Sequence, residues 1–436
     1  MHRELLAVGL SVLALSAGHV CAAAPWIELL DEGFYVTDLS YDGTAAAGNV
    51  VGDGTYETFR WTASTGFVRL GQASVPTLGV GGGSPDISYN GDLISASIAD
   101  SNYNYLTLGR WSLATGTWAE AFVPKPSFVR NVDSAVGSAW GLSGDGQRVV
   151  GYYYLQLPSS YRVQPCAWGP SGSLEDLPAS RGRANAASYD GSVVGGWEDS
   201  GLGPWFPTIW RNGVKYLVAD ALGSTQVNSL NIDGSIGVGD GPDEYFGMKV
   251  AAIFRWNGND YDWQPIGALE DTVYGQGSSR FTSVSDDGTI AVGSNYWGAN
   301  PVMGGDAIIW TPATGLMSGT SYLGSLGLSV PADMELRDFQ SVSPDGSTIA
   351  AVGLRTDTFQ WQTFLIHLRA PCAADFNNDR MVDDTDFVAF STAYDLLDCA
   401  DPSMPLRCPS DIDRDGLVDD TDFVLFAGAY DALLCD

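Results

Sequence analysis

The stretch Val284-Ser285-Asp286-Asp287-Gly288-Thr289-Ile290-Ala291-Val292-Gly293 has the pattern of a β-hairpin. Small and β-branched residues lead into the Asp-Gly pair, and a second apolar run follows it. Glycine adopts a positive φ without a steric penalty from a Cβ atom, so an Asp-Gly pair between two apolar runs is a strong hairpin signal. We therefore predict two antiparallel strands joined by a tight turn.

The same pattern recurs along the chain. Related Asp-Gly or Asn-Gly pairs end at Gly43, Gly91, Gly146, Gly191, Gly234, Gly288 and Gly346. Successive glycines are separated by 43 to 58 residues, a period typical of repeats that each form one small antiparallel sheet. The seven copies predict an all-β seven-bladed propeller over residues 25–370. We interpret the Asp or Asn of each pair as a turn residue, because turn chemistry alone explains it.

A second recurring feature is a strand that ends near a tryptophan and is followed by a glycine turn. The tryptophans are Trp61, Trp111, Trp168, Trp210, Trp256 and Trp310. The seventh repeat reaches the corresponding strand at residues 364–368, but no further strand of the repeat follows. Residues 26–30 resemble the missing strand. We therefore predict that the N-terminal strand completes the last blade, which also removes two exposed sheet edges.

One repeat carries a family resemblance. Asn185-Ala186-Ala187-Ser188-Tyr189-Asp190-Gly191-Ser192-Val193-Val194-Gly195 combines a small-residue strand, a glycine turn and Val-Val-Gly. This sequence resembles the extracellular repeats of HAF type, and the resemblance covers most of residues 25–370. It implies a propeller but no particular ligand or reaction.

Composition and the N-terminus indicate an exported protein. The chain has 436 residues, of which 45% are hydrophobic and 17% charged, so it is expected to fold. Its formal net charge of −31 argues against binding to nucleic acid or to an anionic membrane. Residues 1–24 have a basic start, an apolar run and small residues before residue 25, as in a signal peptide, with a lipid anchor on Cys21 as the alternative. No later segment is apolar enough to span a membrane, so we predict a secreted or cell-surface-associated protein.

The variable loops between each hairpin and its tryptophan strand are the predicted binding face. Equivalent loops of a ring lie on one face, and they are rich in aromatic and acidic residues. The candidate ligand-binding side chains are Tyr103, Tyr154, Trp197, Tyr245, Tyr296 and Trp297. Aromatic faces beside carboxylates and amides would suit a polysaccharide. The alternative is that these rings pack against blade edges.

The sequence offers little for catalysis. After residue 24 the only histidine is His367, which lies in an apolar strand and is interpreted as structural. A histidine-ligated zinc site is therefore excluded, and we assign no catalytic residue. Carboxylate pairs such as Glu198 with Asp199 leave a carbohydrate-active enzyme, of glycoside hydrolase or polysaccharide lyase type, as the alternative to a binding protein. Cys166 is predicted to be a buried free thiol.

The composition changes abruptly in residues 372–436, which contain 16 Asp, no Glu and 3 Arg. This segment repeats itself with an offset of 36 residues. Its two predicted ligand sets are Asp375, Asn377, Asp379, Met381, Asp383 and Asp386, and Asp411, Asp413, Asp415, Leu417, Asp419 and Asp422. Oxygens at loop positions 1, 3, 5, 9 and 12, with a backbone carbonyl at position 7, are the spacing of a calcium loop. We predict two calcium ions.

Each loop leads into one helix, with an apolar stripe of Phe387, Phe390, Tyr394 and Leu397 or of Phe423, Phe426, Tyr430 and Leu433. A duplicated loop and single helix with Asp at position 12 resembles a dockerin module. Arg380 departs from the pattern, which has Gly at that position. The resemblance implies that Asp384, Thr385, Asp420 and Thr421 contact a cohesin-like scaffold protein. A purely structural calcium module is the alternative.

Four cysteines frame the two loops. Two pairings respect the repeat: Cys372 with Cys435 and Cys399 with Cys408, or Cys372 with Cys399 and Cys408 with Cys435. A helix running from Asp386 to Cys399 would end about 20 Å from its own metal site. A disulfide needs Cα atoms within about 7 Å. We favour the first pairing, which fits two antiparallel helices, and the second stays open.

Overall fold

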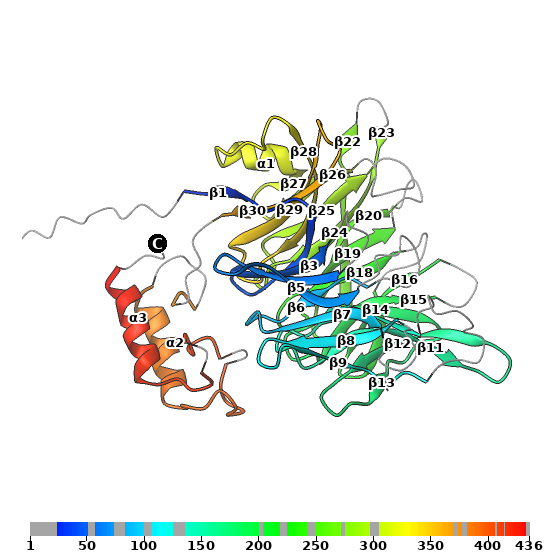
Figure 1. Cartoon of the computed structure of the whole chain (residues 1–436), viewed down its shortest axis with the longest axis horizontal. Helices are drawn as coiled ribbons and strands as arrows, with labels where there is room; N and C mark the ends of the chain where they lie inside the picture. The colour runs from blue at the N-terminus through cyan, green and yellow to red at the C-terminus, as the bar shows by residue number, and fades with distance from the viewer. Residues whose placement is uncertain are drawn as a thin grey trace, which may run out of the picture.

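The computed structural model describes residues 24–50, 57–73, 83–99, 106–124, 136–199, 204–218, 225–242, 249–271, 275–296, 305–368, 374–376, 382–405, 408–413 and 415–432. Seven four-stranded antiparallel sheets form the body of the molecule, and two helices lie beside it (Figure 1). The predicted seven-bladed propeller is therefore confirmed. Within the described ranges, no helix has the length and apolar character needed to cross a membrane.

The blades are built as follows, from the innermost strand outwards. Blade 1 contains β2 (Phe34–Leu39), β3 (Ala45–Val50), β4 (Glu57–Thr62) and β5 (Gly66–Ala73), and blade 2 contains β6 (Asp86–Ile87), β7 (Leu93–Ala99), β8 (Leu106–Ser112) and β9 (Thr117–Glu120). Blade 3 contains β10 (Gly137–Leu142), β11 (Val149–Gln156), β12 (Tyr161–Trp168) and β13 (Leu174–Asp176), and blade 4 contains β14 (Gly182–Ala187), β15 (Val193–Glu198), β16 (Phe206–Arg211) and β17 (Val214–Leu217). Blade 5 contains β18 (Gln226–Leu230), β19 (Ile236–Pro242), β20 (Lys249–Trp256) and β21 (Tyr261–Gly267), and blade 6 contains β24 (Ser278–Val284), β25 (Ala291–Tyr296), β26 (Gly305–Thr311) and β27 (Gly315–Ser318). Blade 7 contains β28 (Met334–Val342), β29 (Thr348–Arg355), β30 (Trp361–His367) and the N-terminal strand β1 (Trp26–Leu29). Three short elements lie outside the blades: the paired strands β22 (Glu270–Asp271) and β23 (Gly275–Gln276), and the helix α1 (Gly319–Ser325).

The N-terminal strand closes the ring, as predicted. β1 runs antiparallel to β30, with Trp26 opposite His367 and Leu29 opposite Phe364 (Figure 1). The Trp26 ring stacks on the imidazole with centroids 4.2 Å apart, and His367 Nε2 lies 3.0 Å from Glu28 Oε2. Burial lowers the pKa of His367, and the hydrogen bond with Glu28 opposes this shift. The histidine thus takes part in ring closure.

The recurring Asp-Gly pairs are turn residues in a larger motif, Ser-x-Asp-Gly. In blade 4, Ser188 Oγ donates to Asp190 Oδ1 at 3.0 Å and accepts from the backbone N–H of Val193 at 3.1 Å. Asp190 Oδ1 also accepts from Ser192 N at 2.9 Å, and Gly191 has a φ of +67°. The other turns have related arrangements, with Asn90 in place of the aspartate in blade 2 and Asn231 in place of the serine in blade 5.

A closed ring of hydrogen bonds joins the seven turns at this end of the propeller. The bonds are Tyr41 N to Tyr89 O, Tyr89 N to Gly144 O, Asp145 N to Tyr189 O, Tyr189 N to Ile232 O, Asn231 Nδ2 to Asp286 O, Asp286 N to Pro344 O and Asp345 N to Tyr41 O, all between 2.7 and 3.0 Å. In addition, Tyr89 Oη donates to Asp286 Oδ1 at 2.7 Å, from blade 2 to blade 6. These contacts tie every blade to the next and narrow the turn end of the central channel.

Large side chains pack between the blades. Phe59, Phe254, Phe281, Phe339 and Phe364 are fully buried and belong to clusters that join neighbouring sheets. Cys166 is also fully buried and is a free thiol, as predicted. Burial raises the pKa of this thiol, so it behaves as a small apolar side chain.

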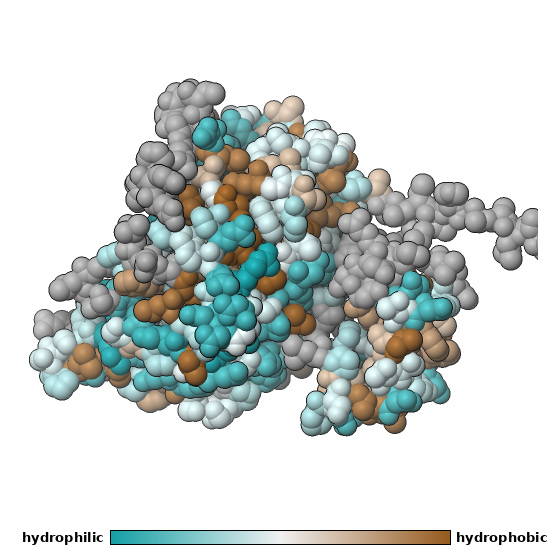
Figure 2. Space-filling view, turned by 180° about the vertical axis from the view of Figure 1, so that it is seen from behind, coloured by the Kyte–Doolittle hydropathy of each residue, from teal (hydrophilic) through white to brown (hydrophobic). Residues whose placement is uncertain are grey.

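The C-terminal segment forms a separate helical pair, α2 (Asp384–Tyr394) and α3 (Asp420–Ala432). Phe390 and Phe426 are buried between the helices, with ring centroids 5.0 Å apart. The predicted stripe is only partly buried, since Phe387 and Phe423 are each 44% exposed. Figure 2 shows hydrophobic residues at the surface of this module.

A disulfide joins Cys399 to Cys408, with Cα atoms 5.5 Å apart. This bond confirms one half of the favoured pairing and excludes the alternative pairing, which uses Cys399 and Cys408 in other bonds. The other two cysteines, Cys372 and Cys435, lie outside the described residues.

Candidate functional site

The second predicted calcium loop gathers three carboxylates. One oxygen each from Asp411, Asp413 and Asp415 lie within 4.8 Å of one another. The backbone folds around them, because Asp415 N donates to Asp411 at 3.1 Å and Gly416 N donates to Asp411 Oδ2 at 2.9 Å. Gly416 has a φ of +94°, which permits the sharp turn of the loop. Leu417 follows, and its N–H donates to Asp415 Oδ1 at 2.9 Å.

The last residue of each loop holds the loop in place. Asp422 is fully buried and accepts hydrogen bonds from the backbone N–H groups of Ile412, Asp413 and Asp419 at 2.6, 3.0 and 3.0 Å. Asp386 is equally buried and occupies the same place in the first loop.

The first loop is described at its two ends only. Asp386 accepts from Phe376 N at 2.7 Å and from Asp383 N at 3.0 Å. Asp375, the first residue of the same loop, is also buried. The predicted ligands Asn377, Asp379 and Met381 lie outside the described residues. The resemblance between the two loops is therefore visible in the hydrogen bonds of their position 12 aspartates.

The donor set of the second loop fits a hard cation. Partial loss of solvent and the charges of Asp422 and Asp415 raise the pKa of Asp413, although its side chain is exposed, so these carboxylates repel one another in the absence of a cation. Carboxylate oxygens are the ligands that Ca²⁺ prefers. The sulfur of Cys399 also lies 3.4 Å from Asp411 Oδ2, but its disulfide leaves no thiolate for a metal.

The four residues expected to contact a partner lie at the first turns of α2 and α3 and are exposed: Asp384, Thr385, Asp420 and Thr421. Tyr394 Oη on α2 donates to Asp420 Oδ1 at 2.5 Å, and Tyr430 Oη on α3 donates to Asp384 Oδ1. The start of each helix therefore meets the end of the other, so the helices are antiparallel. The two aspartates are held by this exchange, whereas the two threonine side chains are exposed.

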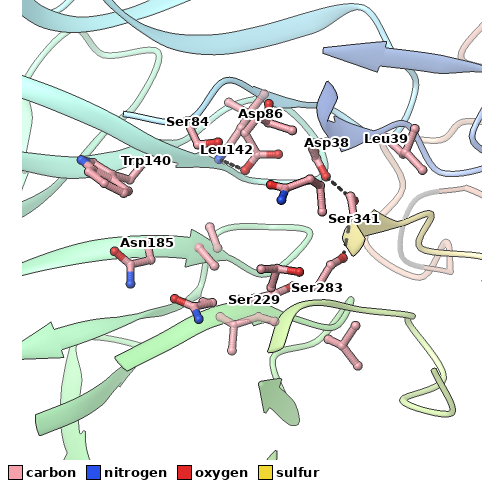
Figure 3. Close-up of a pocket in the computed structure, with 18 of the residues that line it drawn as sticks. Asp38, Leu39, Ser84, Asp86, Trp140, Leu142, Asn185, Ser229, Ser283 and Ser341 are labelled. Carbon is pink, nitrogen blue, oxygen red and sulfur yellow. Dashed lines mark hydrogen bonds between the residues drawn. The ribbon is translucent and has the colours of Figure 1, made fainter. Parts of the chain in front are cut away.

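The propeller has a central cavity of about 290 Å³, lined by the innermost strands (Figure 3). Six of these strands contain a β-bulge at the same place. The bulged residues are Thr37, Trp140, Asn185, Asn228, Thr282 and Gln340, and all six line the cavity. A bulge redirects a side chain out of the sheet pattern, which explains why polar residues face the channel.

Several bulged residues also bind the neighbouring blade. Asn185 Nδ2 donates to Val227 O at 2.8 Å, and Asn228 Nδ2 donates to Phe281 O at 2.8 Å. Thr282 Oγ1 donates to Phe339 O on the next blade at 2.7 Å. The lining is therefore both polar and fixed in position.

A pair of carboxyl groups, Asp38 and Asp86, lies in this channel (Figure 3). Asp38 Oδ2 accepts from Ile87 N at 3.0 Å and Asp86 Oδ2 accepts from Leu142 N at 2.8 Å, each on the next blade. Burial, the charge of Asp38 and a hydrogen bond between the two groups raise the pKa of Asp86 well above its usual range. The backbone hydrogen bonds of the pair join three blades.

A second set of charged residues lies where the innermost strands approach the variable loops. Arg183, Gln226, Arg280 and Asp338 each precede the first turn residue of their blade by five positions, and Asp240 lies opposite Gln226 on β19. We call Arg183, Asp240, Arg280 and Asp338 the mouth cluster. Arg183 lies over the Trp140 ring, with 3.4 Å between its Cζ and the ring centroid.

The mouth cluster combines polar contacts with unpaired atoms. Gln340 Nε2 donates to Asp338 Oδ2 at 2.6 Å, and Lys249 Nζ lies 3.6 Å from Asp240 Oδ2. Both Asp240 carboxylate oxygens, Asp338 Oδ1 and Arg280 Nε are buried and have no hydrogen-bond partner among the described residues. Burial raises the pKa of Asp240 to about 6 against the charges of Lys249 and Arg280, and burial likewise raises the pKa of Asp338 to about 6. Burial lowers the pKa of Arg183 to about 9. Of the four residues, Arg183 and Arg280 line the central cavity, and perturbed groups in a cavity are typical of functional sites.

The predicted aromatic candidates have mixed positions. Trp197 and Tyr296 are buried, and the Trp197 ring stacks on Trp205 with centroids 4.2 Å apart. Tyr154 packs edge-on against Tyr152 and Tyr161. Tyr103, Tyr245 and Trp297 lie outside the described residues. The carboxylate candidate Glu198 forms an ion pair with Lys215 at 2.6 Å.

Sequence reasoning missed the mouth cluster, although a signal was present. Arg183 lies five residues before Ser188 and Arg280 five residues before Ser285. Aligning the repeats on the turn serine, which is present in six of the seven, places these charged residues in one ring. That alignment does not reveal Asp240, which lies on the second strand of its blade.

Comparisons with known proteins give only distant structural matches. No family model matches the chain, and no curated protein matches it. Among solved structures, an oligogalacturonate lyase in complex with manganese matches at 13% identity and a TM-score of 0.48, covering 78% of this chain and 90% of that one. The β-propeller domain of the Trilobed protease from Pyrococcus furiosus matches at 12% identity and a TM-score of 0.46, over 77% and 96% of the two chains. TolB from Acinetobacter baumannii matches at 11% identity and a TM-score of 0.40, covering 76% of this chain but only 65% of TolB. At these identities the likeness carries no information about ligand or reaction.

Proposed function

We propose that this chain is an exported, non-catalytic binding protein whose C-terminal module binds two calcium ions and attaches it to a scaffold or cell-surface protein, while the propeller binds a carbohydrate. The observation that carries the proposal is the convergence of Asp411, Asp413 and Asp415 in a loop fixed by the buried Asp422. The HAF-type and dockerin-like sequence patterns support the two halves.

Calcium titration of the full chain tests the module. After removal of metal with a chelator, isothermal titration calorimetry should report two ions per chain. Asp413→Asn should abolish one of them, because it removes a ligand from the second loop. Asp395→Asn is the matched control, since Asp395 is an exposed residue that caps the end of α2. Absence of calcium binding, or equal binding by the wild type and Asp413→Asn, would overturn the metal assignment.

A pull-down from culture supernatant tests attachment. The full chain should capture a partner in calcium and release it on chelation. The double variant Thr385→Arg, Thr421→Arg should abolish capture, because these exposed side chains occupy equivalent positions at the starts of the two helices. Thr392→Arg, an exposed threonine further along α2, should not. If capture of the partner is unaffected by chelation and by the two threonine substitutions, the calcium module would have a purely structural role.

One feature of the propeller favours binding over catalysis. Paired glycosidase carboxylates lie at least about 5 Å apart. Asp38 and Asp86 are instead hydrogen-bonded to each other and to backbone N–H groups. The alternative, a carbohydrate-active enzyme, is favoured by Asp240 and Asp338, whose raised pKa values would suit acid–base chemistry. Turnover of a polysaccharide that disappears in Asp240→Asn would establish the enzyme and overturn the non-catalytic function.

A further inference from the structure

The disulfide between Cys399 and Cys408 lies beside the second predicted calcium loop. Its two cysteines are separated by 9 positions in the sequence, and Cys408 comes shortly before Asp411, the first predicted ligand of that loop. Cys399 Sγ lies 3.4 Å from Asp411 Oδ2, and Asp411 N donates to Cys408 O at 3.1 Å. Both cysteines therefore contact the residue with which the loop begins.

A short antiparallel bridge holds the middle of the same loop. Cys399 N donates to Gly416 O at 3.1 Å, and Val418 N donates to Leu397 O at 2.7 Å. These two hydrogen bonds flank Leu417, the central residue of the bridge. The backbone carbonyl of Leu417 is the predicted ligand at position 7. The segment that ends at Cys399 therefore holds the backbone at this ligand.

The disulfide connects this bridge to the start of the loop. Through the S–S bond, the segment that pairs with Leu417 is linked covalently to Cys408, which leads into Asp411. A calcium ion in a loop of this kind takes one oxygen from position 1 and one from position 7. The bond therefore limits how far these two ligands can move apart before an ion binds.

The backbone at both ends of this connection has an unusual conformation. Leu397 and Cys408 are non-glycine residues with φ values of +62° and +51°. Such a conformation is costly for residues with a Cβ atom, and it persists where the surrounding contacts enforce it. Here these contacts are the hydrogen bond between Leu397 and Val418 and the disulfide itself. Without the S–S bond, we expect residue 408 to relax and the start of the loop to shift.

We infer that the Cys399–Cys408 disulfide positions the second loop for calcium, so that the calcium affinity of this loop depends on the redox state of the bond. The inference rests on the proposed function, because it requires the second loop to bind calcium. A dithiol reductant would supply two electrons and two protons, convert the S–S bond into two thiols and itself become a disulfide. The thiol of Cys399 would then lie beside Asp411 Oδ2 and donate a hydrogen bond to it, in competition with the ion.

Calorimetry on the full chain, with the two loops measured separately, tests this inference. The double variant Cys399→Ala, Cys408→Ala removes the bond without adding a hydrogen-bond donor. Combined with Asp413→Asn it reports the first loop, and combined with Asp379→Asn, at a predicted ligand of the first loop, it reports the second. Removing the bond should lower the calcium affinity of the second loop by about 10- to 100-fold, the scale set by the closure entropy of so short a loop. The affinity of the first loop should change by less than about threefold.

Two comparisons separate positioning from general destabilisation. Phe426→Leu is the matched control, because Phe426 is buried between the two helices, and it should weaken both loops to a similar extent. A dithiol reductant should lower the affinity of the second loop when Cys399 and Cys408 are present and have little effect on it in the double variant. Hydrogen exchange in chelator gives a measurement that needs no calcium. The amides of residue 399 and Val418 should exchange faster in the double variant, whereas those of α2 should not.

Two results would overturn the inference and leave the proposed function in place. One is unchanged affinity of the second loop in the double cysteine variant. The other is an equal loss of affinity in both loops, which would show that the bond only stabilises the tail as a whole. If the wild type binds no calcium, the metal assignment fails and the inference fails with it, and this result is recognised before any variant is made.

Discussion

Replacing Asp422 by Asn should destabilise the C-terminal module even before calcium is added. The Asp422 carboxylate is fully buried and accepts three backbone hydrogen bonds, from Ile412, Asp413 and Asp419. An asparagine keeps one oxygen but turns an NH₂ group toward at least one N–H donor. Hydrogen bonds to charged groups contribute about 1.5–3 kcal/mol, and an unsatisfied buried donor costs a similar amount, so we expect a loss of about 2–4 kcal/mol.

Asp413→Asn is the matched comparison, because the two residues share one loop. Asp413 is exposed, and its carboxylate accepts from Asp415 N at 3.2 Å. Removing its charge relieves repulsion with Asp415 and Asp422, so stability without calcium should be unchanged or slightly higher. Calcium affinity should fall, because a ligand is lost. The two variants therefore separate the role of holding the loop from the role of binding the ion.

Hydrogen exchange of residues 420–432 in chelator, followed by mass spectrometry, measures the first effect. A loss of about 2–4 kcal/mol corresponds to exchange about 30- to 1,000-fold faster in Asp422→Asn if the module exchanges by cooperative opening. Asp413→Asn should exchange no faster than the wild type, and calorimetry should show its weakened calcium binding. Equal exchange by the two variants, or wild-type exchange by Asp422→Asn, would refute the division of roles.

Three further predictions concern the propeller. Gly234→Ala should lower the free energy of unfolding in urea by about 2–4 kcal/mol, because the new Cβ would lie 2.5 Å from the Cβ of Val193. Gly213→Ala, also at positive φ but facing open space, should lower it by about 1–2 kcal/mol. Equal losses in the two variants would contradict the packing argument. Burial raises the pKa of Asp240 from 3.8 to about 6, so between these pH values the folded state binds more protons than the unfolded state. The free energy of unfolding should therefore fall by up to about 3 kcal/mol as the pH rises from 4 to 6. In Asp240→Asn, the unfolding midpoint should change less over the same pH series. Glu28→Gln should loosen the closing strand and speed hydrogen exchange of residues 26–29, and unchanged exchange would show that backbone pairing alone holds this strand.

The architecture was predictable because it depends on local chemistry repeated seven times. Asp287-Gly288 marks its turn through properties of the two residues themselves, the period between such pairs indicates one small sheet per repeat, and the number of pairs gives the number of blades. The closing strand followed from counting strands in the seventh repeat. The bond between Cys399 and Cys408 was predicted from the reach of a disulfide together with a helix expected to run to Cys399. The helix α2 in fact ends at Tyr394, so the pairing is confirmed but the helix length assumed for it was wrong.

The mouth cluster could not be predicted in the same way. The bulge at Asn185 interrupts the alternation of its strand, so the pattern of the sequence does not show which side chain enters the channel. Asp240 is buried because its strand packs between neighbours in the ring, and nothing in the residues around it signals that burial. Turn chemistry is local, whereas these positions depend on contacts between blades that are 40 or more residues apart.

The two parts of the chain are stabilised by different means, and this difference bears on function. The propeller is held by the paired strands β1 and β30 and by the ring of turn hydrogen bonds, and neither involves residues of the tail. The tail has a small core around Phe390 and Phe426, and modules of this size usually need a metal or disulfide to remain folded. If the tail binds calcium as proposed, removing the metal should therefore weaken this module and leave the propeller intact. Under the proposed function, attachment depends on the tail and ligand binding on the propeller, so a variant in one part should leave the activity of the other part intact.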